Sequence, residues 1–440
     1  IMVVIGVVMI ASPLCMFSYY GNLKPYLDSY YNARRGEVSI PVDTLWPTSV
    51  FRGTFTLSMI FTSPLELRFG IRPCIVASLV LLWASLMSCY VAVQEPLALV
   101  FIFGGTHGFS VGVLYSTSMK LMLQLLADKA GLATGMMSMG PLLGALVNMG
   151  VAFAVINPHS KEPDLFVGNK VFFSDPGITE RVPNYFLVMG AVVIGTTLLG
   201  TIFVFFAKKI DRVQSYKSMS YPQNGELSLR DNDHKQTCLE ENRGRTNLVV
   251  QAELTPWEAL KTVKFYLIWL GYFCTAHVMF LHMDLYKQYG QLAISDDSTL
   301  VTTGIIGLAG AIVGRPCVGI LSDKIGIRKT ALAVSMLSGL FMSLMVISLR
   351  RNPWAYVVFV FFEFLCTSPQ QLVFSLLTAF ELGKTHCASN IGLVSSGNFI
   401  IMFLEPLMSD TLINAVGWDW LFLTGSLGGA ISFISILVLD

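Results

Sequence analysis

Charged side chains are scarce in this chain of 440 residues. Asp, Glu, Lys and Arg together make up 13% of the sequence, whereas about 25% is usual for soluble proteins. Because hydrophobic residues reach 54%, the chain has too few polar residues to form the surface of a soluble protein. This composition excludes a soluble enzyme, a disordered chain and a coiled coil. The net charge of +1 gives no reason to expect a nucleic-acid partner.

The sequence also lacks the spacing patterns of metal sites and disulfide frameworks. Its eight cysteines lie mostly in apolar runs, at positions 15, 74, 89, 238, 274, 317, 366 and 387. We interpret them as reduced packing residues, and we expect no metal and no cofactor. No Asn-x-Ser/Thr site occurs, so glycosylation offers no clue to which membrane holds the protein. The first residue is Ile, which leaves any native N-terminal signal open.

Long apolar runs are what the sequence has instead. A helix of about 20 apolar residues is long enough to span a bilayer. Because lipid cannot form hydrogen bonds with backbone groups, each spanning run is expected to be a helix. Twelve runs meet this length: 3–28, 46–67, 74–94, 97–122, 131–156, 184–207, 264–286, 299–321, 330–349, 353–380, 388–408 and 417–439. The sequence therefore predicts an all-α, multi-pass membrane protein with twelve transmembrane helices.

A charged segment divides these runs into two sets of six. The window 208–264 holds 18 of the 57 charges and few aromatic residues. We expect a solvated linker over 208–262 between an N-terminal six-helix bundle, 1–207, and a C-terminal one, 263–440. The distribution of Lys and Arg favours cytoplasmic ends and a cytoplasmic linker. We expect the plasma membrane, with an organelle membrane as the alternative.

An internal repeat supports this division into halves. Residues 63–72 and 319–328 each follow the second run of their half, and they share Leu, Gly, Ile and Arg at an offset of 256: Leu65, Gly70, Ile71 and Arg72 match Leu321, Gly326, Ile327 and Arg328. Two related halves around a central site are a common plan of secondary transporters.

The second copy, Gly319 to Lys329, resembles the loop motif of the major facilitator superfamily. The resemblance implies two six-helix bundles that move substrate by alternating access. We expect Gly319 to allow close helix packing, Asp323 to cap or pair near a helix end, and Arg328 and Lys329 to anchor at the inner leaflet. Gly326 belongs to the same motif. The first copy departs from it, since Leu67 stands in place of the acidic residue.

Several short motifs, in this order, look like the oxalate/formate-antiporter-like branch and the related monocarboxylate transporters. They are Gly131–Gly135, Ile156–Pro158, Phe173–Pro176, Arg181–Pro183, Leu285–Gly290 and Arg315–Pro316. In the fifth run, small residues that include Gly140 and Gly144 form a surface suited to helix packing, and Pro141 can bend the helix.

Charged side chains within the spans are the candidates for a substrate site. Arg315 resembles the carboxylate-binding arginine of that branch, and a guanidinium can bind a carboxylate through two hydrogen bonds. Lys24 matches a lysine in the first helix of monocarboxylate transporters, although it is also placed to reach the membrane interface. Tyr19, Tyr20 and Asn22 can contribute hydroxyl and amide groups or simply pack. For Arg52 we favour an interfacial anchor over a role in steering anions.

Two positions depart from these families. Ala311 replaces an expected Asp one turn before the arginine, and Asn398 stands where oxalate/formate antiporters have a lysine. Other groups must then carry any coupled proton, and the candidates are Glu363, His107 and His277. Glu405 is expected at the interface, and Lys287 in an outer loop.

The sequence therefore predicts a secondary transporter of small, lactate- or pyruvate-like monocarboxylates, coupled to protons and embedded in the lipid bilayer. The sequence leaves the question of an accessory membrane subunit open. The alternatives are an oxalate/formate-type exchanger and a receptor that kept the fold without transport. An enzyme is disfavoured, because no cluster of residues has metal-ligand or nucleophile spacing.

Overall fold

The computed structural model describes residues 2–34, 43–126, 130–205, 254–383 and 386–439. Most of the predicted linker lies outside these residues, as do its predicted boundary with the first bundle and the basic residues near position 208.

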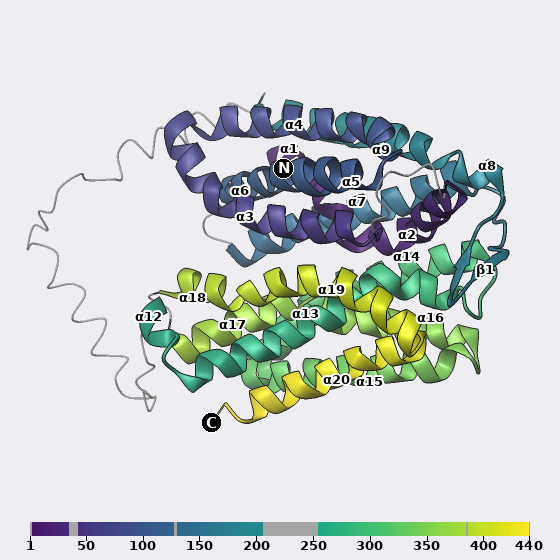
Figure 1. Cartoon of the computed structure of the whole chain (residues 1–440). Coiled ribbons are helices and arrows are strands. Elements are labelled where there is room, and N and C mark those ends of the chain that lie inside the picture. Colours follow the sequence, from purple (N-terminus) through teal and green to yellow (C-terminus); the bar gives the residue numbers. More distant parts are fainter. Residues whose placement is uncertain (1, 35–42, 127–129, 206–253, 384–385, 440) are drawn as a thin grey trace, which may run out of the picture.

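Two groups of helices lie side by side along their lengths (Figure 1). The first group, coloured purple to blue-green, comprises α1 (Met2–Ala11), η1 (Ser12–Cys15), α2 (Met16–Ala33), α3 (Trp46–Phe69), α4 (Ile71–Ala92), α5 (Pro96–Leu99), η2 (Val100–His107), α6 (Gly108–Leu125), α7 (Ala130–Ile156), α8 (Pro176–Thr179) and α9 (Val182–Phe205). The second group, green to yellow, comprises α12 (Pro256–Ala259), α13 (Val263–Gly290), α14 (Asp297–Ile325), α15 (Ile327–Leu349), α16 (Pro353–Thr367), α17 (Gln370–Leu382), α18 (Cys387–Val394), α19 (Ser396–Ala415) and α20 (Trp418–Leu437).

The twelve-helix fold predicted from the sequence is confirmed. Within the described residues, eleven helical segments are long and apolar enough to cross a membrane. The predicted second span forms α3, a helix of 24 residues with lower hydropathy, which carries Arg52 and Glu66. One short hairpin was not predicted: β1 (Leu165–Val167) pairs antiparallel with β2 (Lys170–Phe172), with Phe166 opposite Val171.

Proline and glycine set the breaks and turns in these spans. Pro13 lies in the tighter turn η1 that divides the first span, and Pro369 lies between α16 and α17. A proline ring removes a backbone donor, so both sites interrupt a regular helix. Gly70 and Gly326 both adopt φ of +89°, a conformation that favours glycine, and each joins two spans in a tight turn. The internal repeat thus corresponds to one turn geometry used twice.

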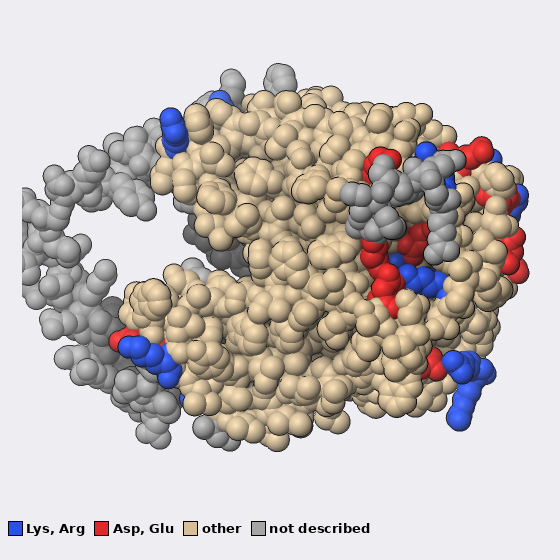
Figure 2. Space-filling model, in the orientation of Figure 1, with Lys and Arg blue, Asp and Glu red and all other residues tan. Residues whose placement is uncertain are grey.

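The two groups are in contact at one end of the molecule. We call it the hairpin end, because β1 and β2 lie there, and we call the opposite end, where α12 lies, the linker end (Figure 1). At the hairpin end α2 packs on α13, α14 on α7, and α3 on α19. Figure 2 shows charged side chains gathered at this end and a notch between the two groups at the linker end. The two groups are therefore closed against each other at the hairpin end and apart at the linker end (Figure 2).

Gly21 allows a close approach between the groups. A Cβ atom at Gly21 would lie 2.1 Å from the carbonyl oxygen of Met283, so α2 and α13 meet backbone to backbone. Gly140 of α7 approaches Val8 of α1 in the same way, since a Cβ atom there would lie 2.5 Å from a carbonyl oxygen. The packing role predicted for the small residues of the fifth span agrees with this contact.

Candidate functional site

Arg315 lies inside α14 without a carboxylate partner among the described residues. Its Nε donates to Ser368 Oγ at 3.0 Å, and its Nη1 donates to the carbonyl oxygen of Ser138 at 3.4 Å. Tyr115 of α6 is near enough to interact with it electrostatically. The break at Pro369 ends α16 and leaves the Ser368 hydroxyl beside the guanidinium. Since Ser138 and Tyr115 belong to the first group, both groups surround a cation that can bind an anion.

Lys24 is neutralised in this conformation. Its Nζ lies 2.8 Å from Asp28 Oδ2 and 3.9 Å from Asp43 Oδ1. Lys24 is nine residues from the hairpin end of α2, whereas Arg315 is eighteen from the hairpin end of α14. At 1.5 Å per residue these depths are about 14 and about 27 Å, so the two cations lie at different levels of the bundle. A substrate role for Lys24 stays a prediction.

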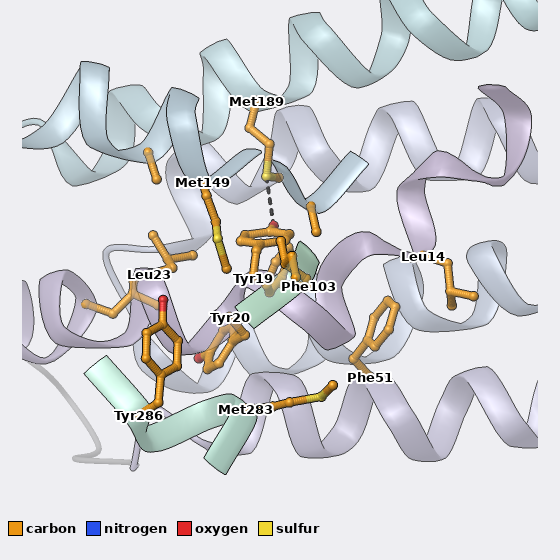
Figure 3. Close-up of a cluster of buried hydrophobic side chains, with 14 of the residues drawn as sticks. Leu14, Tyr19, Tyr20, Leu23, Phe51, Phe103, Met149, Met189, Met283 and Tyr286 are labelled. Carbon is orange, nitrogen blue, oxygen red and sulfur yellow. Dashed lines mark hydrogen bonds between the residues drawn. The ribbon is translucent and has the colours of Figure 1, made fainter. Parts of the chain in front are cut away.

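The two tyrosines of the first span point into packed protein. Figure 3 shows Tyr19 and Tyr20 among apolar side chains that include Phe103 and Met283. The Tyr19 hydroxyl donates to the sulfur of Met189 at 3.0 Å, and the Tyr20 hydroxyl donates to the backbone oxygen of Thr44. Both side chains are buried. Their contribution to a substrate site stays a prediction that requires a different conformation.

The two candidate amides lie in different surroundings. Asn22 accepts a hydrogen bond from Lys287 Nζ at 3.0 Å, across the boundary between the groups. Asn398 donates to the hydroxyl of Tyr272 at 2.9 Å, within the second group. Only Asn22 therefore takes part in a contact between the two groups, and the predicted substrate role of both stays untested.

Neither predicted histidine lies at the boundary between the groups. His107 packs against the rings of Phe51 and Phe103, at centroid distances of 5.5 and 5.3 Å. His277 Nε2 lies 2.9 Å from the hydroxyl of Thr424 on α20. Each imidazole thus interacts inside a single group, and their role in proton coupling stays a prediction.

Glu363 is fully buried in α16 beside a histidine that the sequence analysis did not select. His282 Nδ1 lies 4.0 Å from Glu363 Oε1 and donates to the carbonyl oxygen of Val278. Among the described residues, neither carboxyl oxygen of Glu363 has a hydrogen-bond partner. Glu363 is therefore a carboxyl that can carry a proton, although its neighbours all belong to the second group.

A cluster of polar residues closes the hairpin end, and we call it the hairpin-end lock: Asn22, Tyr26, Asn157, Lys287 and Asp297. Lys287 Nζ lies 2.8 Å from Asp297 Oδ1, and both residues belong to the second group. Tyr26 and Asn157, from the first group, donate to Asp297 Oδ2, the latter at 2.9 Å. Lys287 in turn donates to Tyr26 Oη at 3.0 Å. Charged residues of one group thus bind neutral residues of the other.

The prediction that Lys287 lies in an outer loop is wrong. The side chain is completely buried near the end of α13, because Asp297 and two residues of the first group replace its water. The motifs Ile156–Pro158 and Leu285–Gly290 did contain Asn157 and Lys287. The motifs did not show that Asn157 binds Asp297, or that Lys287 binds Asp297, Asn22 and Tyr26.

A second buried cluster, the Arg52 triad, joins α3, α13 and α19. Arg52 Nη2 lies 2.7 Å from Asp284 Oδ2, and Nη1 donates to Glu405 Oε2 at 3.1 Å. The guanidinium also lies over the ring of Phe280, 4.0 Å from its centroid. Arg52 is therefore no interfacial anchor, and the expectation that Glu405 lies at the interface is also wrong. Counting the acidic residues inside spans together with the basic ones would have suggested such pairs.

Charged groups of both helix groups surround the hairpin. Lys170 of β2 forms an ion pair with Asp410 of α19. Burial alone would lower the pKa of Lys170, but Asp28, Asp43 and Asp410 raise it overall. Burial also raises the pKa of Asp43 to about 6, against the opposing effect of Lys24. The hairpin therefore adds a cation to an acidic cluster drawn from both groups, namely Asp28, Asp43 and Asp410.

Asp296 stabilises the start of α14. Its carboxylate accepts hydrogen bonds from the backbone of Thr299 and from the hydroxyl of Ser160 in the first group. Although burial opposes it, hydrogen bonding holds the pKa of Asp296 well below its usual range. This N-terminal cap also links α14 to the first group.

The motif at the linker end forms the turn between two spans, and the anchoring role of Arg328 and Lys329 stays a prediction. Gly326 makes the turn between α14 and α15, and Arg328 donates to the carbonyl oxygen of Leu437 at 3.2 Å, at the end of α20. Asp323 and Lys329 are exposed. The expected close packing at Gly319 is not present within the described part of the chain, since no atom lies within 4 Å of a Cβ there.

The chain is similar to known proteins over nearly its whole length. The sequence profile of the Major Facilitator Superfamily matches residues 5–386. A D-xylose-proton symporter structure covers 99% of this chain and 96% of its own, with a TM-score of 0.68 and 10% identity. The transporter FucP in its outward conformation gives full coverage of both chains, with a TM-score of 0.56 and 13% identity. XylE from E. coli, partially occluded and inward open, gives 98% and 96% coverage, a TM-score of 0.63 and 11% identity. No curated protein sequence matches the chain.

Proposed function

Because the chain belongs to the major facilitator superfamily of membrane transporters, we propose that it carries small organic monocarboxylates across the membrane together with protons. One observation carries this proposal. Arg315, within the bundle, has no carboxylate partner among the described residues and meets groups from both halves.

The charge of the site favours a monoanion. Asp28 neutralises Lys24, which leaves one cation without an acidic partner among the candidate substrate residues. A lactate- or pyruvate-like anion would balance the charge of Arg315, whereas a dianion such as oxalate would leave one negative charge uncompensated. The site therefore supports a monocarboxylate carrier over an oxalate exchanger.

Binding at Arg315 would also link the two groups of helices. The guanidinium lies on α14, while Ser138 and Tyr115 lie on α7 and α6. A bound anion that contacts residues of both groups would favour their approach at the linker end, which is the step that leads to an occluded state. The conformation described here, closed at the hairpin end, is the one that would release substrate to the linker side.

Uptake into proteoliposomes tests this function. Radiolabelled lactate, pyruvate, formate and oxalate would be offered with and without an inward proton gradient, to the wild type and to Arg315→Ala. Hydrogen bonds to charged groups contribute about 1.5–3 kcal/mol, so loss of the guanidinium is expected to weaken binding roughly 10- to 150-fold. Arg351→Ala, at an exposed arginine of the hairpin end, is the matched control.

The rival functions give different results in this assay. Exchange that needs carboxylate on both sides and ignores the proton gradient would indicate an exchanger. Binding without uptake would indicate a receptor. Lactate uptake that is equal in Arg315→Ala and the wild type would refute the substrate role of Arg315.

A further inference from the structure

The Arg52 triad contains one more acidic group than basic group. Arg52 is the single cation, and Asp284 and Glu405 both contact its guanidinium. All three side chains are buried, so with both carboxyls ionised the cluster would hold a net negative charge away from water.

Two carboxyl oxygens of the triad have no hydrogen-bond donor, and of these Asp284 Oδ2 still lies 2.7 Å from Arg52 Nη2. Glu405 Oε2 accepts from Arg52, but Oε1 is buried and has no hydrogen-bond partner among the described residues. An ionised carboxylate oxygen buried without a donor is costly, whereas the same oxygen with a proton attached is neutral. The position of Oε1 therefore suits a bound proton.

The surrounding charged and titratable groups leave this imbalance in place. Lys24 and Tyr20 approach Asp284 from α2, and Asp43 approaches Glu405 from the segment before α3. Asp28 and Asp43 both lie beside Lys24, so the lysine adds no net positive charge to the neighbourhood.

The triad also spans the boundary that must open during transport. Arg52 belongs to the first group, whereas Asp284 and Glu405 belong to the second. Arg52 and Asp284 are each six residues from the hairpin end of their helices, about 9 Å along the axis. Opening of the hairpin end would separate the cation from both carboxyls and admit water. Glu363, by contrast, has its neighbours inside one group.

We propose that Glu405, with Asp284 and Arg52, is the proton-binding site that links proton uptake to closure of the hairpin end. A proton moves from water on the hairpin side to Glu405 Oε1, and no other covalent bond changes. With the proton, the triad is neutral and the closed state is favoured. After the proton leaves on the linker side, the net negative charge favours reopening. This inference rests on the proposed proton coupling, but its test needs no substrate.

The test measures closure of the hairpin end against pH. Spin labels at the exposed positions 180 and 351, one on each group, would report their separation by double electron–electron resonance in a cysteine-free background. The closed fraction of the wild type is expected to rise as pH falls, with the closed-to-open ratio changing up to tenfold per pH unit for one linked proton.

Two neutral variants and one control separate the possible outcomes. Glu405→Gln, which mimics the protonated side chain, is expected to stay closed at every pH, and Asp284→Asn serves if that variant does not fold. Glu363→Gln, a buried carboxyl of one group, should keep the wild-type response. A pH-independent wild type, a response retained in Glu405→Gln, or closure driven by sodium in place of protons would overturn the proposal. Because no carboxylate is added, failure of lactate transport would leave this result intact.

Discussion

Tyr26 offers the sharpest test of how the hairpin end is held closed. Its hydroxyl donates to Asp297 and accepts from Lys287 at 3.0 Å, so it binds both charged residues of the opposite group. Tyr26→Phe removes these two hydrogen bonds but keeps the aromatic ring, whose centroid lies 4.1 Å from Lys287 Nζ. The ion pair between Lys287 and Asp297 lies within the second group and is unaffected by opening.

The size of the effect follows from these contacts. Each hydrogen bond to a charged group contributes about 1.5–3 kcal/mol. Asp297 keeps Asn157, and Lys287 keeps Asn22, so we take the net loss as about 2–3 kcal/mol. Only the closed state contains these bonds, and the closed-to-open ratio should therefore fall roughly 30- to 150-fold.

Spin-label distances at positions 180 and 351 measure that ratio directly. Tyr356→Phe is the matched control, because its buried hydroxyl donates to the carbonyl oxygen of Tyr286 at 2.6 Å, inside the second group. Equal closed fractions in Tyr26→Phe and Tyr356→Phe would refute the idea that the hairpin-end lock sets the conformation.

Two further substitutions test the same end of the molecule. Gly21→Ala places a Cβ atom 2.1 Å from the carbonyl oxygen of Met283, so the groups must separate and the spin-label distance should lengthen. Gly310→Ala is the control, because the added Cβ atom is crowded inside the second group. It should lower the melting temperature without changing the spin-label distance. Asp43 has a pKa of about 6, above its ordinary 3.8, so the folded protein binds more protons between about pH 4 and 6 and its stability should fall as pH rises through that window. Melting curves of Asp43→Asn should show a smaller fall, and curves parallel to the wild type would contradict this reading.

Much of the fold follows from local properties of the sequence. The length of an apolar run predicts a spanning helix, and the repeated glycine at an offset of 256 predicts two equivalent turns. Both features depend only on residues that are neighbours in the sequence. The central charged segment predicts a division into halves, whose boundaries stay predictions. The hairpin β1–β2 was missed, since two strands of three residues leave no strong alternating pattern.

The candidate site was less predictable because buried charge depends on partners far away in sequence. Arg315 was selected as a cation within a span, and it lies within the bundle near residues of both groups. Lys287 lies near the end of α13, and Glu405 lies near the end of its predicted span, 388–408, although it is in the middle of α19. Near the end of an apolar run, local sequence favours the membrane interface. The burial of Lys287 and Glu405 results from Asp297 and Arg52, and Arg52 is 353 positions from Glu405. No local pattern carries that information.

The closed hairpin end is held by hydrogen bonds, and this affects the energetics of the whole cycle. When the groups separate, water can replace each bond of the hairpin-end lock, so each bond to a charged group costs only about 1.5–3 kcal/mol net. A seal of apolar side chains would instead lose about 25 cal/mol for every Å² exposed to water. Hydration thus keeps the two conformations similar in free energy. A tenfold concentration gradient of proton or substrate, which corresponds to about 1.4 kcal/mol, is then large enough to set the direction of transport.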